Sequence, residues 1–434
     1  MTIGDFFSRH RRKFFVAIGA SAGIYMMVQF VKNKLIELQE KFIFERMAKD
    51  NMERRFEQNQ KDATFTTLAL LPTVATQILE KYDVEGAKRE LQALRAPPAQ
   101  SQDAKLADAS AADSGEAPRP SSNPDEPEAH LGSSVVSDLT SSVQTDAATA
   151  SLDGSIAVVA SPSATASKTA LWSRIKIESF TRAFTLVYTM ALLTLLTRIQ
   201  LNILGRRTYL ASLQEMSEKG LSLEESDVND NVNRQYLTFS WWLLNKGWQP
   251  LGQRVEAAVT AVLSETDVRT ELNAAQLVDV ISRIQFTVDS AEQRLDTDAS
   301  PLEPRPSSFL ANLLPPHELE TYVLSQAPGS VMAPDIVEGY LREMINETAD
   351  IIDSPNAAQV VHHLVSNGLS VFLNKLKPLY GDDKSTTKLA SILANATRQA
   401  HYMAAGHPSE NEYVSAMSVI PELDALCAII YSNV

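Results

Sequence analysis

The sequence predicts an all-α protein with one N-terminal transmembrane helix. Three observations support this fold class. Apolar residues recur at helical spacing along most of the chain, no convincing run of alternating strand pattern occurs, and one uncharged apolar segment follows a basic N-terminus. With 434 residues, 44% of them hydrophobic, the chain is long enough to bury a sizeable core.

The N-terminal apolar segment covers residues 14–31 and contains no charged side chain. At about 1.5 Å per residue, such a helix spans roughly 27 Å, which is close to the hydrocarbon thickness of a bilayer. It follows a basic cluster of Arg9, Arg11, Arg12 and Lys13. We expect a retained membrane anchor, because the apolar run is longer than that of a cleaved signal peptide. The basic cluster by itself would hold the N-terminus in the cytosol.

The segments on either side of residue 96 differ sharply in composition. From Ile24 to Leu71 the chain contains neither glycine nor proline, which predicts one long helix that leaves the membrane and enters the soluble domain. Residues 98–167 carry ten acidic and two basic side chains and are rich in alanine, serine and proline. Such a composition cannot bury enough apolar surface to offset the entropy of ordering. We therefore expect a disordered acidic insert over residues 97–167.

The segment after this insert has the pattern of a central helix. Between Ile177 and Leu195 apolar residues follow the spacing of one helix face, and beyond Leu186 the opposite face is apolar too. A second membrane span is the alternative, but only fifteen uncharged residues lie between Arg182 and Arg198, which is short for a span. We expect a buried core helix. Further helices are predicted at 230–246, 250–264, 271–294, 334–353, 356–377, 384–404 and 410–431, with a proline-rich linker at 301–316.

A search for chemistry gives no catalytic residue, metal site or cofactor site. The chain has no glycine-rich dinucleotide fingerprint, no His-Glu-x-x-His motif and no nucleophile elbow. His362 and His363 are adjacent and point to different sides of a helix, so they cannot chelate one metal. The single cysteine, Cys427, cannot form an internal disulfide, which favours a reducing compartment. No clustered positive surface is predicted, so we expect no nucleic acid partner. We do not expect an enzyme.

The sequence predicts burial for three tryptophans and partial exposure for the fourth. Trp241, Trp242 and Trp248 lie within the helical body, where such clusters usually belong to the core. Trp172 instead lies about 110° from the centre of the apolar stripe on its own helix, taking 100° per residue. Its neighbours on that side include Lys176 and Arg182, together with a serine. We therefore expect Trp172 to be partly exposed, as tryptophans that anchor protein interfaces are.

Several segments together resemble the peroxin-3 family of peroxisomal biogenesis factors. The resemblance touches both ends and the middle of the chain, in the same order, which makes it more specific than any single motif. The segments are RHRRK before the apolar span, residues 54–73, LWSRIKIESFTR at 171–182, RIQLNILG at 198–205 and INETADIIDSP at 345–355. The acidic insert is much longer than the short loop of that family.

The resemblance implies an elongated helical bundle in the peroxisomal membrane, with a single span, a lumenal N-terminus and a cytosolic C-terminal domain. This topology overrides the one that the basic cluster alone suggests. The expected organisation is a lumenal tip and targeting segment at 1–13, the anchor at 14–31, a stalk and first long helix at 32–96, the insert at 97–167 and a cytosolic helical domain at 168–434.

The resemblance also implies a function and a site. The family docks the soluble receptor peroxisomal biogenesis factor 19, which carries newly made membrane proteins and binds through an amphipathic N-terminal helix in an apolar groove. The family's groove tryptophan falls on Trp172, its lysine on Lys168 and a leucine of the preceding helix near Leu94, with Leu91 beside it. Peroxisomal membrane lipid is the other partner implied.

Three alternatives stay open on the sequence alone. Members of the family also serve as tethers for organelle inheritance or autophagy factors. A membrane-anchored enzyme would show a polar cleft with convergent ionisable groups, whereas a docking protein would show an exposed apolar groove near Trp172. A purely structural stalk would lack such a groove.

Overall fold

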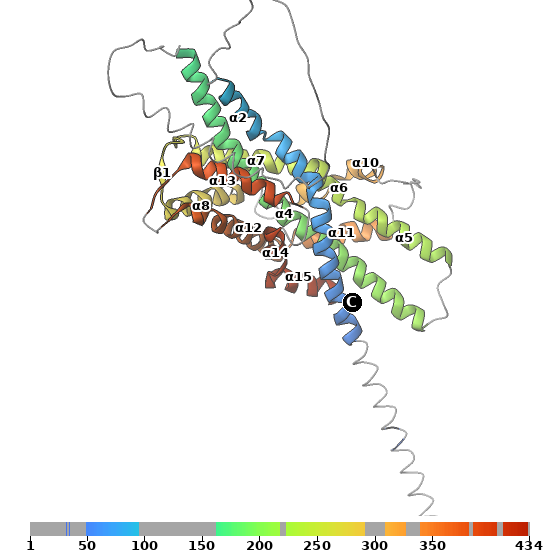
Figure 1. Ribbon diagram of the computed structural model, residues 1–434. Helices are drawn as coiled ribbons and strands as arrows, with labels where there is room; N and C mark the ends of the chain where they lie inside the picture. Colours follow the sequence, from blue (N-terminus) through green and yellow to red (C-terminus); the bar gives the residue numbers. More distant parts are fainter. Residues whose placement is uncertain are drawn as a thin grey trace, which may run out of the picture.

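The computed structural model describes an all-α protein, which confirms the predicted fold class (Figure 1). The described residues are 32, 34, 49–94, 162–217, 223–290, 309–326, 339–381, 385–405 and 411–432. The predicted span at 14–31, the basic cluster before it and most of the predicted insert lie outside these residues.

The continuously described part of the first helix covers residues 49–81 and is drawn in blue in Figure 1. The helices that follow are α2 (Val84–Ala93), α4 (Pro162–Ser217), α5 (Leu223–Thr238), α6 (Ser240–Trp242), α7 (Trp248–Leu263), α8 (Ala274–Ser290), α9 (Leu310–Leu313), α10 (Glu320–Leu324), α11 (Tyr340–Ile352), α12 (Pro355–Leu376), α13 (Leu389–Met403), α14 (Glu412–Ser418) and α15 (Pro421–Ser432). A π-helical turn η1 (Leu243–Gly247) and the 3₁₀ turns η2 (His317–Leu319) and η4 (Lys377–Leu379) complete the helical elements.

Helix α4 is the centre of the bundle, as its apolar pattern predicts. Helices α2, α7, α12, α13 and α15 all pack against it. Its segment Ser167–Ser212 is apolar enough to cross a membrane, yet 94% of the most apolar window is buried inside the protein. It is therefore the core helix and not a second span. The helix begins at Pro162, six residues before the predicted domain boundary at 168, so residues 162–167 of the predicted insert are helical.

The C-terminal helical region is broken where the sequence predicted one helix over 410–431. Helices α14 and α15 meet at Pro421 with a bend of 57°. Proline has no backbone N–H to continue a helix and restricts the residue before it, which explains the break. The prediction places the start of two further helices, 271–294 and 384–404, several residues too early. Near the start of these ranges lie two short strands, β1 (Glu271–Leu272) and β2 (Thr387–Lys388), which pair antiparallel.

A close backbone contact joins the π-helical turn η1 to α9. A Cβ on Gly247 would lie 1.9 Å from the carbonyl oxygen of Asn312, whose side-chain amide donates to the carbonyl of Gly247 at 2.8 Å. The Gly247→Ala variant should therefore lose about 1–3 kcal/mol of stability, the usual cost of overpacking. Its thermal unfolding midpoint, followed by circular dichroism, should fall by several degrees.

The matched control for this variant is Gly339→Ala. Nothing lies within 4 Å of a Cβ placed on Gly339. The thermal unfolding midpoint of this variant should equal that of the wild type. Equal midpoints for the Gly247→Ala and Gly339→Ala variants would contradict the close contact.

Candidate functional site

Helix α2 and the first turns of α4 lie at the upper end of the bundle in Figure 1, away from the lower end of the blue first helix. The two helices are antiparallel, because Glu85 pairs with Arg182 while Glu90, further along α2, pairs with Arg174, which is earlier in α4. Continued along both helices, this register places the C-terminal end of α2 against the beginning of α4. We call this end the tip and define it by Leu91, Leu94, Lys168 and Trp172.

The antiparallel register places the four predicted partner-binding residues at the same end of α2 and α4. Leu91 is buried, whereas Leu94 at the end of α2 is 42% exposed. Trp172 is partly buried and packs against the core, and Lys168 one turn earlier is also partly buried. Leu94 therefore presents apolar surface at the end of α2, and Trp172 is partly exposed near the beginning of α4. The predicted targeting residues Arg9, Arg11, Arg12 and Lys13 lie outside the described residues.

The reason given for the exposure of Trp172 was wrong, although the ring is partly exposed. Its polar neighbours on α4 do not face solvent. Lys176 is 3% exposed and Arg182 is 0% exposed. The ammonium of Lys176 donates to the carbonyl oxygens of Leu263 and Thr266, each at 2.6 Å, and so caps the C-terminal end of α7. Burial lowers the pKa of Lys176. The side of α4 that carries Lys176 and Arg182 thus packs against other elements, whereas Trp172, nearer the beginning of α4, is only partly buried.

An ion pair between the fully buried Arg182 and Glu85, whose side chain is 43% exposed, holds the N-terminal end of α2 against α4. The guanidinium of Arg182 donates to both carboxylate oxygens of Glu85, at 2.7 and 2.9 Å, and His401 of α13 contacts the same carboxylate at 3.1 Å. Burial alone would raise the pKa of Glu85, but the hydrogen bonds from His401 and Arg182 outweigh it and hold that pKa well below its usual range. The pair therefore stays charged at any physiological pH.

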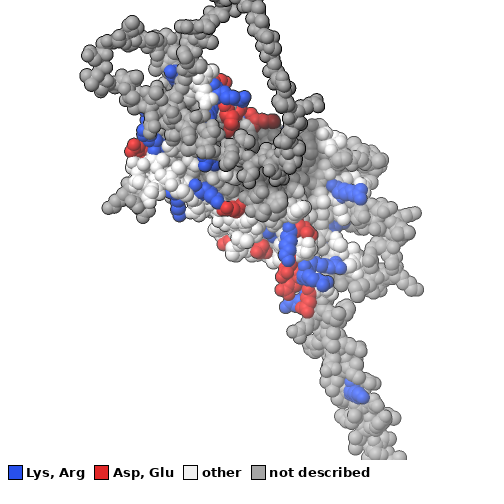
Figure 2. All heavy atoms as spheres, viewed as in Figure 1, with Lys and Arg blue, Asp and Glu red and all other residues white. Residues whose placement is uncertain are grey.

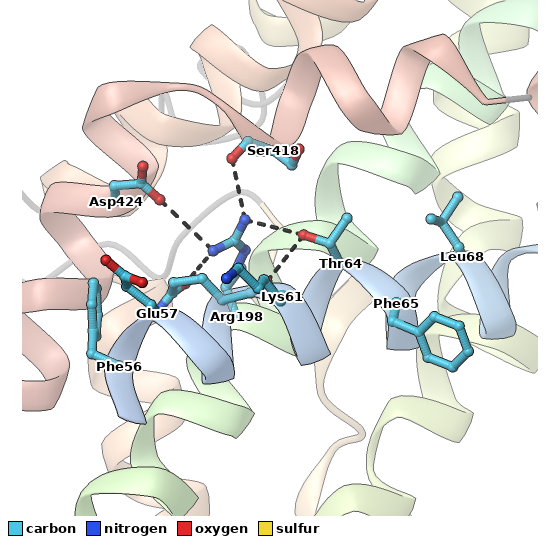
Figure 3. A pocket seen from close by; sticks show the side chains of 10 residues that line it. Phe56, Glu57, Lys61, Thr64, Phe65, Leu68, Arg198, Ser418 and Asp424 are labelled. Carbon is cyan, nitrogen blue, oxygen red and sulfur yellow. Dashed lines mark hydrogen bonds and ion pairs between the residues drawn. The ribbon is translucent and has the colours of Figure 1, made fainter. Parts of the chain in front are cut away.

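The structure also contains a cavity of about 600 Å³ between the first helix and the elbow of α14 and α15 (Figure 3). Phe56, Thr64 and Leu68 line it from the first helix. Arg198 of α4 lies at its inner side and donates to Gln60, to Thr64 and to the carbonyl oxygen of Ser418. Burial lowers the pKa of Arg198. Its guanidinium joins three elements, and this cavity was not predicted from the sequence.

No signal in the sequence marked this cavity. Its polar partners come from positions far apart in the chain, and Phe65 at its edge, which is 66% exposed, falls within an otherwise ordinary helical pattern. Aromatic residues at helical spacing usually belong to the core.

Charged side chains of both signs are interspersed on the face shown in Figure 2, over α2 and over the lower part of the described first helix. Among the described residues on this face, no extended basic patch of the kind that binds nucleic acid is seen. The described residues also contain no group of three or more histidine, cysteine or acidic side chains placed to hold a metal ion.

The remaining tryptophans divide between core and surface. Trp248 is 3% exposed and belongs to the core, as predicted. Trp241 and Trp242 are only partly buried; Trp241 packs edge-on against Tyr322 at 5.7 Å between ring centroids. Cys427 is buried, and burial raises the pKa of its thiol to about 12, so the thiol is unreactive in the folded protein.

Taken together, the fold and the tip define the class of all-α bundles arranged around one long buried helix, with apolar surface exposed at one end. The sequence profile of the Peroxin-3 family matches residues 5–433. The chain belongs to the peroxin-3 family. This membership gives it a role in peroxisome biogenesis and in the import of peroxisomal membrane proteins.

Named relatives agree with this assignment over nearly their whole length. The chain is 38% identical to peroxisomal biogenesis factor 3 of Yarrowia lipolytica, covering 99% of both proteins. It is 26% identical to peroxisomal membrane protein PEX3 of Komagataella phaffii, covering 98% of this chain and 97% of the relative. Identity to peroxisomal biogenesis factor 3 of Rattus norvegicus is 22%, covering 98% and 95%.

Proposed function

We propose that this protein is the docking receptor of the peroxisomal membrane for peroxisomal biogenesis factor 19, which brings newly made membrane proteins. The amphipathic N-terminal helix of that factor binds at the tip. The observation that supports the proposal is that Trp172 is partly exposed and Leu94 is 42% exposed, and that the register of α2 and α4 places both at one end of the bundle.

The chemistry of the tip supports an apolar helix as the ligand. Leu94 and Trp172 supply apolar contact area, and Leu91 is buried in the core cluster against which Trp172 packs. Lys168 at the beginning of α4 adds a positive charge, which complements acidic residues flanking an apolar helix face. Docking of this kind requires no nucleotide or metal ion, and we propose that the protein is not an enzyme.

The proposed topology follows from the same arrangement. A single span at 14–31 anchors the chain with its N-terminus in the lumen, and the helical domain faces the cytosol. The tip then lies on the side of the domain away from the lower end of the blue first helix in Figure 1, where a soluble receptor has access.

The test is a titration of the whole chain, reconstituted in lipid nanodiscs, with purified peroxisomal biogenesis factor 19 and with a peptide of its N-terminal helix. Calorimetry should give one site for each ligand and similar affinities for both, because the helix carries the binding. Absence of heat with both ligands would refute the docking function.

A further inference from the structure

Helix α2 cannot hold its own position at the tip. It has ten residues, which is too short for a stable isolated helix in water. The chain leaves helical geometry at Tyr82 and Asp83, so α2 is not a rigid continuation of the first helix. Its orientation therefore depends on side-chain contacts with the rest of the bundle.

These contacts are unequal along α2. Three apolar side chains face the core, Val84, Ala87 and Leu91. The strong polar contact is at the N-terminal end, where Glu85 receives two hydrogen bonds from Arg182 and one from His401, so that one carboxylate joins α2, α4 and α13.

A second ion pair, nearer the tip, is weaker. Glu90 and Arg174 lie 3.7 Å apart, and neither side chain is buried, so water screens their attraction from both sides. Of these two ion pairs, the one between Glu85 and the fully buried Arg182 is thus the stronger. Fixing the N-terminal end of α2 therefore also fixes the position of its C-terminal end, where Leu91 and Leu94 lie.

We propose that Glu85 and Arg182 are positioning residues of the tip. Their two-pronged ion pair sets the angle at which α2 lies on α4, and so holds Leu91 and Leu94 near Trp172 for the incoming apolar helix. The inference rests on the proposed function for its ligand, but the position of α2 can be measured without any ligand.

The ion pair suits this role because it is directional. A carboxylate that accepts hydrogen bonds from two nitrogens of one guanidinium is fixed in plane and orientation. Apolar contacts alone would allow the helix to slide and rotate. Arg182 is fully buried in the central helix, so its own position is fixed by the core.

The test uses the Glu85→Gln variant of the whole chain in nanodiscs. Hydrogen exchange of the amides of residues 84–93 should become faster, while amides of α4 keep their protection. If the docked population of α2 falls to about a tenth, the affinity for the receptor peptide falls about tenfold, because only the docked fraction binds. The milder Glu85→Asp variant keeps the charge and should lie between wild type and Glu85→Gln.

The matched control is Glu347→Gln. Glu347 pairs with the nearly buried Arg206 at 2.6 Å, which joins α11 to α4 away from the tip. This variant should lower the thermal midpoint while leaving exchange in α2 and peptide affinity unchanged. A comparable loss of affinity in Glu347→Gln would show that general destabilisation, and not position, is responsible.

Two results overturn the inference. One is unchanged exchange in α2 for Glu85→Gln; the other is unchanged peptide affinity despite faster exchange. If the wild type itself does not bind the peptide, the proposed docking function fails, and the exchange of residues 84–93 still decides whether Glu85 positions α2.

Discussion

The Trp172→Ala variant should bind the receptor's helix more weakly by about 2–4 kcal/mol, or roughly 30- to 900-fold, which is the range of an interface hot spot. The physical reason is the loss of a large, partly exposed ring that already packs on the core and needs little ordering to receive a ligand. Calorimetry on the whole chain in nanodiscs measures the change in dissociation constant directly.

The control for this variant is Trp241→Ala. Trp241 is also partly buried, but it packs against Tyr322 on α10 and not at the tip. Its replacement should leave the dissociation constant within a factor of about two, since energetic coupling between distant sites is small. An affinity for Trp172→Ala that matches that of Trp241→Ala would rule out the tip as the docking site.

The Phe184→Ala variant should lose about 3–5 kcal/mol of stability, the usual cost of deleting a buried aromatic ring. Phe184 is 0% exposed in the middle of α4, with the ring of Phe180 at 6.5 Å. Because every neighbouring helix packs on α4, the cavity cannot close without moving several elements. The thermal unfolding midpoint of the whole chain in detergent, followed by circular dichroism, should fall markedly.

Phe286→Ala is the corresponding surface control. Phe286 lies on α8 and is 70% exposed, so its replacement should change stability by no more than about 0.5 kcal/mol. If the Phe184→Ala and Phe286→Ala variants had equal thermal unfolding midpoints, α4 would not be the core helix of the bundle.

The central helix illustrates what periodicity can and cannot predict. Its apolar pattern identified a buried helix correctly, because burial on all sides leaves apolar residues on every face. The same pattern assigned Lys176 and Arg182 to a polar face beside solvent, which was wrong. Their partners are the carbonyl groups that end α7 and the carboxylate of Glu85, and these are 87 to 97 residues away in sequence. No local pattern contains such partners.

The tip was predicted in part by a different route. Periodicity indicated only that Trp172 is off the apolar stripe, whereas the resemblance to a family placed Lys168, Leu91 and Leu94 beside it. The ion pair of Glu85 was missed, because a glutamate in the first turn of a helix usually needs no further explanation. The bend at Pro421 was missed, although proline commonly ends helices, because the apolar pattern continues across Pro421 and predicted a single helix.

The docking account depends on contact between the tip and the receptor's helix, and photo-cross-linking tests this contact most directly. A photoreactive amino acid replaces Leu94, which is 42% exposed at the tip, or Phe286, which is 70% exposed on α8. After illumination with purified peroxisomal biogenesis factor 19, the account predicts a cross-link from position 94 to the N-terminal segment of that factor and none from position 286. Cross-links from position 286 alone, or from neither position while the two proteins are bound, would contradict it.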